Sequence, residues 1–252
     1  GMTVSLHTKF DANKSIEEIL NGTVTRMSVV AVTLERLISV LEERNQTFPD
    51  TFQSMLVGGG PVPLHYLERA IKCKIPVLQT YGMTETSSQT TTLSSEDAIR
   101  KLGSAGKPLF FAEIRISGEK EIGEICIKGP HVTKGYIGAA SSTDPQDDGW
   151  LHTGDMGYID DEGYLYVVDR RSDLIISGGE NIYPAEVEQA IVKHRAVKEA
   201  GVTGIQDDKW GHVPIAFVVL KSEVTEEELK SFMKTQLATY KQPVRYYFIE
   251  EL

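Results

Sequence analysis

A carboxylate and a guanidinium that could act together flank one short stretch of the sequence. Asp155 precedes, and Arg170 follows, two alternating apolar runs at 156–160 and 164–168, which an acidic-glycine turn separates. This pattern is typical of a β-hairpin. The hairpin would bring the two side chains together, where they could grip a ribose diol and a nearby phosphate. The alternative is an ordinary surface ion pair, which the two residues alone would favour.

Two loops earlier in the chain carry residues suited to nucleotide chemistry. The three consecutive glycines at 58–60 let the backbone approach a flat ligand closely. In the second loop, Tyr81 could stack on a base and the Thr84 hydroxyl could donate to a phosphate oxygen. Glu85 offers the hard oxygen that Mg²⁺ prefers. Taken alone, the glycines also suit a plain turn, and the second loop a threonine-capped helix.

The elements that must position these loops alternate between strand and helix patterns. The patterns predict strands at 3–6, 23–32, 54–57 and 75–80, and helices at 11–20, 33–44 and 64–71. Strands alternating with helices predict a parallel sheet with connections on its faces. Ligands of such sheets bind beyond the carboxyl ends of strands, where both loops fall.

The pattern changes twice further along the chain. Short β-like runs at 110–117 and 123–129, with the hairpin, predict a small barrel or sandwich. A polar surface loop is expected at 141–149. The remaining elements predict a small α+β domain: strands at 174–176, 200–205, 213–220 and 246–249, a helix from Pro184, and a helix from the Thr225 cap to Leu237.

We therefore expect an α/β protein in three parts. The parts are a portion of a large α/β domain at 1–102, a β-rich subdomain at 103–171, and a small α+β domain at 172–252.

Composition and charge narrow the class of function. The chain has 252 residues and a formal net charge of −10, which argues against a nucleic-acid backbone or an anionic membrane as partner. Its two cysteines, Cys73 and Cys126, lie in apolar patterns and are expected to be buried small hydrophobes in a reducing compartment. No apolar run approaches the roughly 18 residues that would span a bilayer, and no signal-peptide pattern opens the chain. We expect a cytoplasmic protein.

Five motifs in a fixed order carry a resemblance to a known family. They are Gly-Gly-Gly-Pro-Val-Pro-Leu at 58–64, Gln-Thr-Tyr-Gly-Met-Thr-Glu at 79–85, Gly-Glu-Ile-Cys-Ile-Lys-Gly-Pro at 123–130, Trp-Leu-His-Thr-Gly-Asp at 150–155, and Asp-Arg-Arg-Ser-Asp-Leu-Ile-Ile-Ser-Gly-Gly-Glu-Asn-Ile-Tyr-Pro at 169–184. Together they resemble the adenylate-forming acyl-CoA synthetases. The resemblance covers essentially the whole chain from Ser54 onward and is carried by motifs of high specificity.

The resemblance implies a two-step ligation. A carboxylic acid attacks the α-phosphate of ATP, with Mg²⁺, to give an acyl-adenylate and pyrophosphate. The thiol of coenzyme A then attacks the acyl-adenylate and releases AMP. The implied partners are a small carboxylic acid, ATP and coenzyme A, with no nucleic acid and no membrane insertion. A homo-oligomeric state is left open.

The same resemblance assigns roles to individual residues. Those implied in nucleotide binding are Gly60, Pro61, Gln79, Thr80, Tyr81 and Gly82. Thr84 would contact the α-phosphate and Glu85 would bind Mg²⁺. Asp155 would hold the ribose hydroxyls with Arg170 beside it, so the resemblance favours the ribose clamp over the surface ion pair. Catalysis would depend on Thr84, Glu85 and Arg170.

The acid pocket and the second step have implied residues of their own. The pocket would include Gly58, Gly59, Met83, Ser87 and Ser88. Its polar character suits an acid with a second carboxylate or a ketone, and the motifs are most similar to the subgroup that activates o-succinylbenzoate in menaquinone biosynthesis. The serine hydroxyls could instead only cap a helix. The small domain would pivot at Ser172, and Gly178, Gly179 and Glu180 would approach the pantetheine of coenzyme A.

Two parts of the family pattern have no counterpart in this sequence. Residues 1–57 contain no phosphate loop rich in Ser, Thr and Gly, and 250–252 stop short of a Gly-Lys motif. We therefore expect the carboxy-terminal half of a longer ligase, which binds adenosine but adenylates poorly and tends to associate through exposed sheet edges. Three alternatives stay open: a fatty or aryl acid–CoA ligase, an adenylation domain that loads a carrier protein, and a non-catalytic nucleotide-binding fragment.

Overall fold

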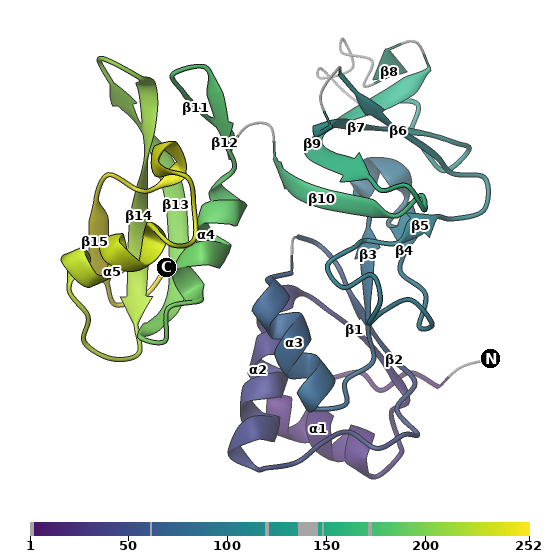
Figure 1. The fold of residues 1–252 in the computed structure, drawn as a ribbon. Coiled ribbons are helices and arrows are strands. Elements are labelled where there is room, and N and C mark those ends of the chain that lie inside the picture. Colours follow the sequence, from purple (N-terminus) through teal and green to yellow (C-terminus); the bar gives the residue numbers. More distant parts are fainter. Residues whose placement is uncertain (1–2, 61, 119–120, 136–145, 148, 171–172) are drawn as a thin grey trace. The chain divides into compact units, whose positions relative to one another are not determined.

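A computed structural model describes residues 3–60, 62–118, 121–135, 146–147, 149–170 and 173–252 (Figure 1). The chain forms two compact units. Unit 1 contains Gly1–Thr153 and Tyr158–Val167, and unit 2 contains Gly154–Gly157 and Val168–Leu252. The three-part division expected from the sequence stays a prediction.

Unit 1 begins with an α/β layer. Its elements are α1 (Ala12–Leu20), β1 (Arg26–Val29), α2 (Ala31–Glu43), β2 (Ser54–Val57), α3 (Leu64–Lys72), β3 (Val77–Tyr81), the 3-10 turn η1 (Thr84–Thr86), β4 (Thr91–Thr92) and β5 (Lys107–Pro108). The sheet order is β1-β2-β3-β4-β5. The first three strands are parallel, as predicted, and β4 and β5 run antiparallel to their neighbours. Figure 1 shows the three helices gathered on one side of β1, β2 and β3.

Helical spacing of apolar residues accounts for the core of this layer. Leu34, Leu37, Ile38 and Leu41 of α2 recur at intervals of three and four, so they share one face, and all four are fully buried. They pack in one cluster with residues of α1, β2 and α3 and with Cys73, which directly follows α3. Burial raises the pKa of the Cys73 thiol.

One predicted strand of unit 1 is wrong. Residues 3–6 form no strand, and Val4 and Leu6 are 76% and 88% exposed. Alternating apolar residues make a strand only where a partner strand accepts their backbone hydrogen bonds, and none pairs with this segment in the described structure.

A second sheet has the order β10-β9-β7-β6, with β8 paired to β9. Its strands are β6 (Glu113–Ser117), β7 (Gly123–Lys128), β8 (Gln146–Asp147), β9 (Trp150–Ile159) and β10 (Leu165–Arg170). The predicted hairpin is present as β9 and β10, and Cys126 of β7 is fully buried, as expected. The expected loop at 141–149 is wrong at 146–147, which form β8; residues 141–145 and 148 lie outside the described residues. The division between the two units passes through the hairpin.

Unit 2 continues with an α+β arrangement. Its elements after β10 are β11 (Ile175–Ser177), β12 (Glu180–Ile182), α4 (Pro184–Val192), β13 (Val197–Asp207), β14 (Gly211–Leu220), α5 (Glu226–Met233), the 3-10 turn η4 (Thr239–Lys241) and β15 (Tyr246–Ile249). The sheet order is β12-β11-β14-β13, with β15 parallel to β14.

The helices of unit 2 begin where the sequence predicts. Pro184 opens α4, and Thr225 caps α5 in a reciprocal capping box with Glu228. Helix α5 ends at Met233, four residues before the predicted Leu237. None of the helices in the described part of the chain is both long and apolar enough to cross a bilayer.

Candidate functional site

The glycine loop at 58–60 and the loop that begins at Tyr81 leave neighbouring parallel strands at the same edge of the sheet. The glycines follow β2, the tyrosine loop follows β3, and Val57 is in register with Gln79. A Cβ atom on Gly58 would lie 2.5 Å from Oγ1 of Thr80, so only glycine lets the strands approach this closely. Gly59 has a φ of +82°, which favours glycine too. Pro61 lies outside the described residues.

The side-chain amide of Gln79 is buried and makes a hydrogen bond inside the protein. The side chain is 7% exposed, and its Nε2 donates a 2.8 Å hydrogen bond to the carbonyl oxygen of Ser104. Ser104 is fully buried and donates its own hydroxyl to the carbonyl of Leu165, the first residue of β10, at 2.8 Å. A buried pair of hydrogen bonds therefore links strand β3 to the hairpin. Sequence spacing offered no signal for Ser104.

The loop after β3 is tightly folded. A Cβ atom on Gly82 would lie 1.9 Å from the carbonyl oxygen of Ser88, so the chain folds back onto Gly82. Ser87 and Ser88 have φ angles of +53° and +92°, a conformation that residues other than glycine seldom adopt. The buried Thr86 exchanges two hydrogen bonds with the backbone of Met83.

The side chains of this loop differ in exposure. Thr84, Ser87 and Ser88 are exposed, Glu85 is half-buried, and Tyr81 and Met83 pack against the core of the second sheet. Of the predicted phosphate and acid residues in this loop, Thr84, Ser87 and Ser88 are therefore accessible, whereas Met83 is partly buried. Among the described residues, no group of three or more His, Cys, Asp or Glu side chains is placed to hold a metal ion. A Mg²⁺ ion at Glu85 would therefore take most of its ligands from phosphate and water oxygens.

The predicted hairpin is present, but Asp155 and Arg170 lie inside its strands β9 and β10 and not before and after them, because both strands extend beyond the alternating apolar runs. Asp155 is 7% exposed, so it is more deeply buried than an ordinary surface ion pair would be. Only the backbone of Arg170 is described, and Ser172 lies outside the described residues.

The predicted loop on the coenzyme side is a tight turn between β11 and β12. Gly178 and Gly179 have φ angles of +58° and +87°, and Glu180 begins β12. The backbone N–H of Gly178 donates to the carbonyl of Trp210 at 2.7 Å, and a Cβ atom at Gly178 would lie 2.8 Å from the Trp210 ring. Trp210, half exposed, is a neighbour that sequence reasoning missed.

A side chain of strand β10 accepts from a backbone N–H in the first turn of helix α4. The cap residue Tyr183 makes no side-chain hydrogen bond, while Oδ2 of Asp169 accepts from the N–H of Ala185 at 3.0 Å. One turn later, Glu188 accepts from the N–H of Val202 at 2.8 Å. Burial raises the pKa of Glu188 despite this hydrogen bond. Neither acid was predicted.

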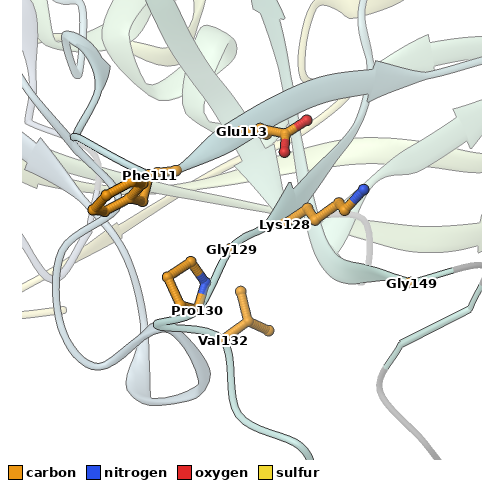
Figure 2. A pocket seen from close by; sticks show the side chains of 8 residues that line it. Phe111, Glu113, Lys128, Gly129, Pro130, Val132 and Gly149 are labelled. Atoms are coloured by element: carbon orange, nitrogen blue, oxygen red, sulfur yellow. The ribbon is translucent and has the colours of Figure 1, made fainter.

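A hollow of about 560 Å³ lies on the second sheet (Figure 2). It is lined by Phe111, Ala112, Glu113, Lys128, Gly129, Pro130, Val132 and Gly149. None of these is a predicted site residue.

Comparisons with known proteins agree along the whole chain. The family model described as AMP-binding enzyme matches residues 1–137, and the model described as AMP-binding enzyme C-terminal domain matches 186–252. The 2-succinylbenzoate–CoA ligase of Geobacillus sp. (strain WCH70) is 52% identical over 261 residues, covering 100% of this chain and 53% of that protein. The corresponding ligase of Bacillus pumilus (strain SAFR-032) is 51% identical over 259 residues, covering 100% and 52%. The chain thus spans about half the length of the curated relatives it matches.

Solved structures give the same result. The o-succinylbenzoate CoA synthetase (MenE) of Bacillus subtilis in complex with the acyl-adenylate intermediate OSB-AMP matches with a TM-score of 0.88 and 49% identity, over 98% of this chain and 51% of that one. The same enzyme with ATP and magnesium ion matches with a TM-score of 0.86 and 48% identity, over 98% and 52%. These matches confirm the α/β fold class predicted from the sequence.

Proposed function

This chain belongs to the AMP-binding enzyme family, and we propose that the protein containing it is an ATP-dependent 2-succinylbenzoate–CoA ligase. The observation that carries the proposal is the 52% identity to a ligase of that name over 100% of this chain. Structures of a similar enzyme with an acyl-adenylate, and with ATP and magnesium, support the order of the two steps.

In the first step, a carboxylate oxygen of the acid bonds to the α-phosphorus of ATP, and the bond to the pyrophosphate oxygen breaks. The residues we assign to the nucleotide are Gly60, Pro61, Gln79, Thr80, Tyr81 and Gly82. Tyr81 stacks on the adenine. Gln79 holds the adenine-binding segment in place from the interior through its hydrogen bond to the carbonyl of Ser104. Asp155 holds the ribose hydroxyls, since a carboxylate can accept from both. Arg170 is assigned beside it.

Thr84 donates to an α-phosphate oxygen, and Glu85 holds Mg²⁺. When bound, the ion offsets the negative charge of the phosphates. In the loop after β3 the Thr84 side chain is exposed and Glu85 is half-buried, so Thr84 is accessible to a phosphate and Glu85 is partly so to the ion.

In the second step, the sulfur of coenzyme A bonds to the acyl carbon, and AMP leaves with the electron pair. Gly178, Gly179 and Glu180 are assigned to the approach of the thiol. The positive φ angles of both glycines leave this turn without side-chain bulk. Ser172 is assigned as the pivot of the small domain.

The acid pocket comprises Gly58, Gly59, Met83, Ser87 and Ser88. The Ser87 hydroxyl already donates to the carbonyl of His131, so the exposed Ser88 hydroxyl is the one that can donate to a second carboxylate or a ketone, which a plain fatty acid lacks. We expect 2-succinylbenzoate to outcompete octanoate for the ligase in calorimetry. Tighter binding of octanoate would contradict the assignment of 2-succinylbenzoate as the substrate.

The polypeptide of 252 residues is expected to bind AMP yet to be a poor adenylating enzyme by itself, because it carries no glycine-rich phosphate loop in 1–57. Pyrophosphate exchange on the purified polypeptide, dependent on ATP and 2-succinylbenzoate, checks this. Robust exchange would contradict the expectation, and an absence of AMP binding in calorimetry would contradict the nucleotide site itself.

A further inference from the structure

A second segment of unit 1 holds the acid-binding loop at three points. The segment is Gly129–Thr133, which follows β7, and the loop is Met83–Thr90. The N–H of Thr133 donates to the carbonyl of Glu85 at 2.7 Å, and the Ser87 hydroxyl donates to the carbonyl of His131 at 3.0 Å. The His131 ring nitrogen Nε2 lies 3.3 Å from Oγ1 of the buried Thr90.

The loop needs such support because its backbone is strained. A positive φ is unfavourable for a residue with a side chain, and Ser87 and Ser88 adopt it in succession. Within the loop, the N–H of Ser88 donates to the carbonyl of Met83 at 3.2 Å. Strained residues persist only where their surroundings over-determine them, and the contacts from the second segment supply that constraint.

The segment Gly129–Thr133 faces the hollow with some residues and the acid-binding loop with others. Pro130 and Val132 line the hollow of Figure 2, whereas His131 between them contacts the acid-binding loop. Gly129 allows this arrangement, because a Cβ atom there would lie 2.7 Å from Nδ1 of the His131 ring. The ring is therefore packed against the backbone on one side and bonded to Thr90 on the other.

We propose that Gly129–Thr133 is a brace for the acid-binding loop and that His131 is its positioning residue for the acid substrate. The inference rests on the proposed function, which assigns Ser87 and Ser88 to the acid. In the contacts given above His131 touches neither the loop after β2 nor the hairpin, and the proposed function assigns only Thr84 of the braced loop to the phosphate of AMP, so loss of His131 should weaken the acid more than AMP. It pre-organises the serines, and a pre-organised site binds more tightly than one that must first order itself.

The brace is testable without any ligand. In His131→Ala, the backbone amides of Thr86, Ser87, Ser88 and Thr90 should exchange with deuterium about tenfold faster or more. His131→Gln should restore much of the protection, since its Nε2 can occupy the place of the ring nitrogen. The matched control His194→Ala lies in unit 2 and should leave these amides unchanged. Unchanged exchange in His131→Ala would overturn the proposal that the His131 side chain braces the loop.

The positioning role needs a second readout, which a merely structural role would not produce. Calorimetry with AMP alone, and with 2-succinylbenzoate in the presence of AMP, should show the acid weakened about tenfold or more in His131→Ala, with AMP affinity within about twofold of the parent chain. His131→Gln should recover the acid affinity. Equal loss of both ligands would overturn the positioning role. If the parent chain binds neither ligand, the proposed function fails, while the exchange experiment still decides the brace.

Discussion

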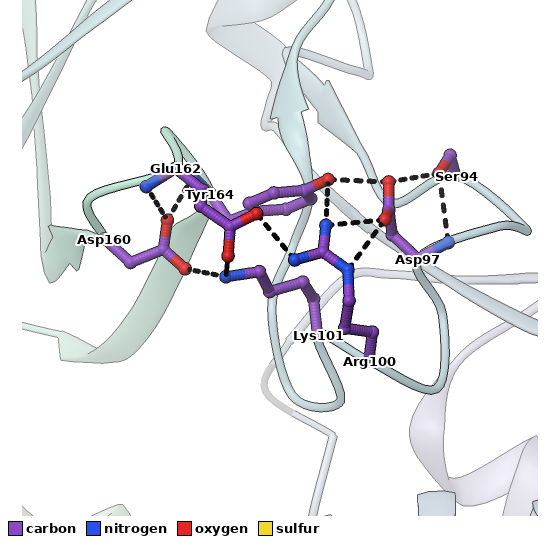
Figure 3. A network of polar contacts seen from close by, with 7 residues as sticks. All are labelled: Ser94, Asp97, Arg100, Lys101, Asp160, Glu162 and Tyr164. Carbon is purple, nitrogen blue, oxygen red and sulfur yellow. Dashed lines mark hydrogen bonds and ion pairs between the residues drawn. The ribbon is translucent and has the colours of Figure 1, made fainter.

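The hydroxyl of Tyr164 donates a 2.6 Å hydrogen bond to Oδ2 of Asp97, and this bond fastens the hairpin turn to the segment after β4 (Figure 3). Arg100 joins both partners, donating to the Tyr164 oxygen at 3.1 Å and to Oδ1 of Asp97 at 2.7 Å. Lys101 donates to Asp160 at 2.7 Å on the other side of the turn. Two elements distant in the sequence are thereby held in one polar network.

Replacing Tyr164 with Phe should lower the thermal midpoint of unfolding, because Asp97 loses one of its donors. The aromatic ring would remain against the Lys107 ammonium, which lies 4.5 Å from its centre, so the change isolates the hydroxyl. Circular dichroism during heating measures the effect. The control Tyr240→Phe removes a hydroxyl from an exposed ring and should leave the midpoint unchanged. Equal midpoints for Tyr164→Phe and the parent chain would contradict the prediction.

Asp97 should make unfolding sensitive to acid. The hydrogen bond from Tyr164, followed by those from Arg100 and Ser94, lowers the pKa of the Asp97 carboxyl in the folded chain. The stability it contributes is therefore present above its unfolded pKa of about 3.9 and is lost as the pH falls through the lower folded value. Asp97→Asn should be less stable at pH 7 and lose less on acidification, as urea unfolding at several pH values would show. Parallel pH profiles would argue against this origin.

Glu188 should have the opposite effect. Burial raises its folded pKa, so the stability associated with the protonated form is present below about pH 4.3 and is lost as the pH rises through the folded value. Glu188→Gln removes the buried charge and keeps an oxygen for the N–H of Val202. It should raise the thermal midpoint at pH 7.5 and make no difference near pH 3.5. On the same helix, Glu186 pairs with Lys241 at 2.7 Å, and Glu186→Gln should give no such gain.

Gly103 and Gly106 offer a matched pair, since both have a φ of +89°. At Gly106 a Cβ atom would lie 2.0 Å from the backbone carbon of Thr92, whereas nothing lies within 4 Å at Gly103. Gly106→Ala should cost more than about 3 kcal/mol in the free energy of unfolding, and Gly103→Ala about 1 kcal/mol from its conformation alone. Denaturant titration of both variants measures the difference, and equal costs would refute the clash.

The clamp of the proposed function depends on Asp155. Asp155→Ala should abolish measurable AMP binding in calorimetry, because the ribose hydroxyls lose their acceptor. Asp161→Ala, in the exposed hairpin turn, is the control and should bind AMP normally. Ser172→Pro should also retain AMP, yet in an active ligase it should slow thioester formation by fixing φ at the pivot. If Asp155→Ala binds AMP with the affinity of the parent chain, the proposed role of Asp155 in holding the ribose is contradicted.

Local sequence patterns predicted much of the fold. The strands at 54–57 and 246–249 coincide with β2 and β15, and the caps at Pro184 and Thr225 are confirmed. The strand at 3–6 failed because a local pattern carries no information about a distant partner strand. Strand β12 was missed for the converse reason, since its polar residues form a strand only by pairing with β11.

The positions of the site residues were less accessible to sequence reasoning. The order of motifs located the loops, and the register of β2 and β3 agrees with their shared edge. Ser104, His131 and Trp210 act through contacts with residues far away in the sequence, and no spacing rule reveals such contacts. The bent backbone at Ser87 and Ser88 is likewise a product of tertiary packing, because serine has no local preference for it.

The two cysteines allow local unfolding of unit 1 to be followed by the reactivity of its own thiols. Cys73, at the end of helix α3, lies in the core of the α/β layer, and Cys126 lies in the second sheet. Each is a buried thiol that a reagent in solution reaches only after local unfolding. Unit 2 contains no cysteine at all. The rates at which a thiol reagent labels Cys73 and Cys126 therefore report local unfolding at two separate places in unit 1. Unit 2 contributes no signal, and no cysteine has to be introduced.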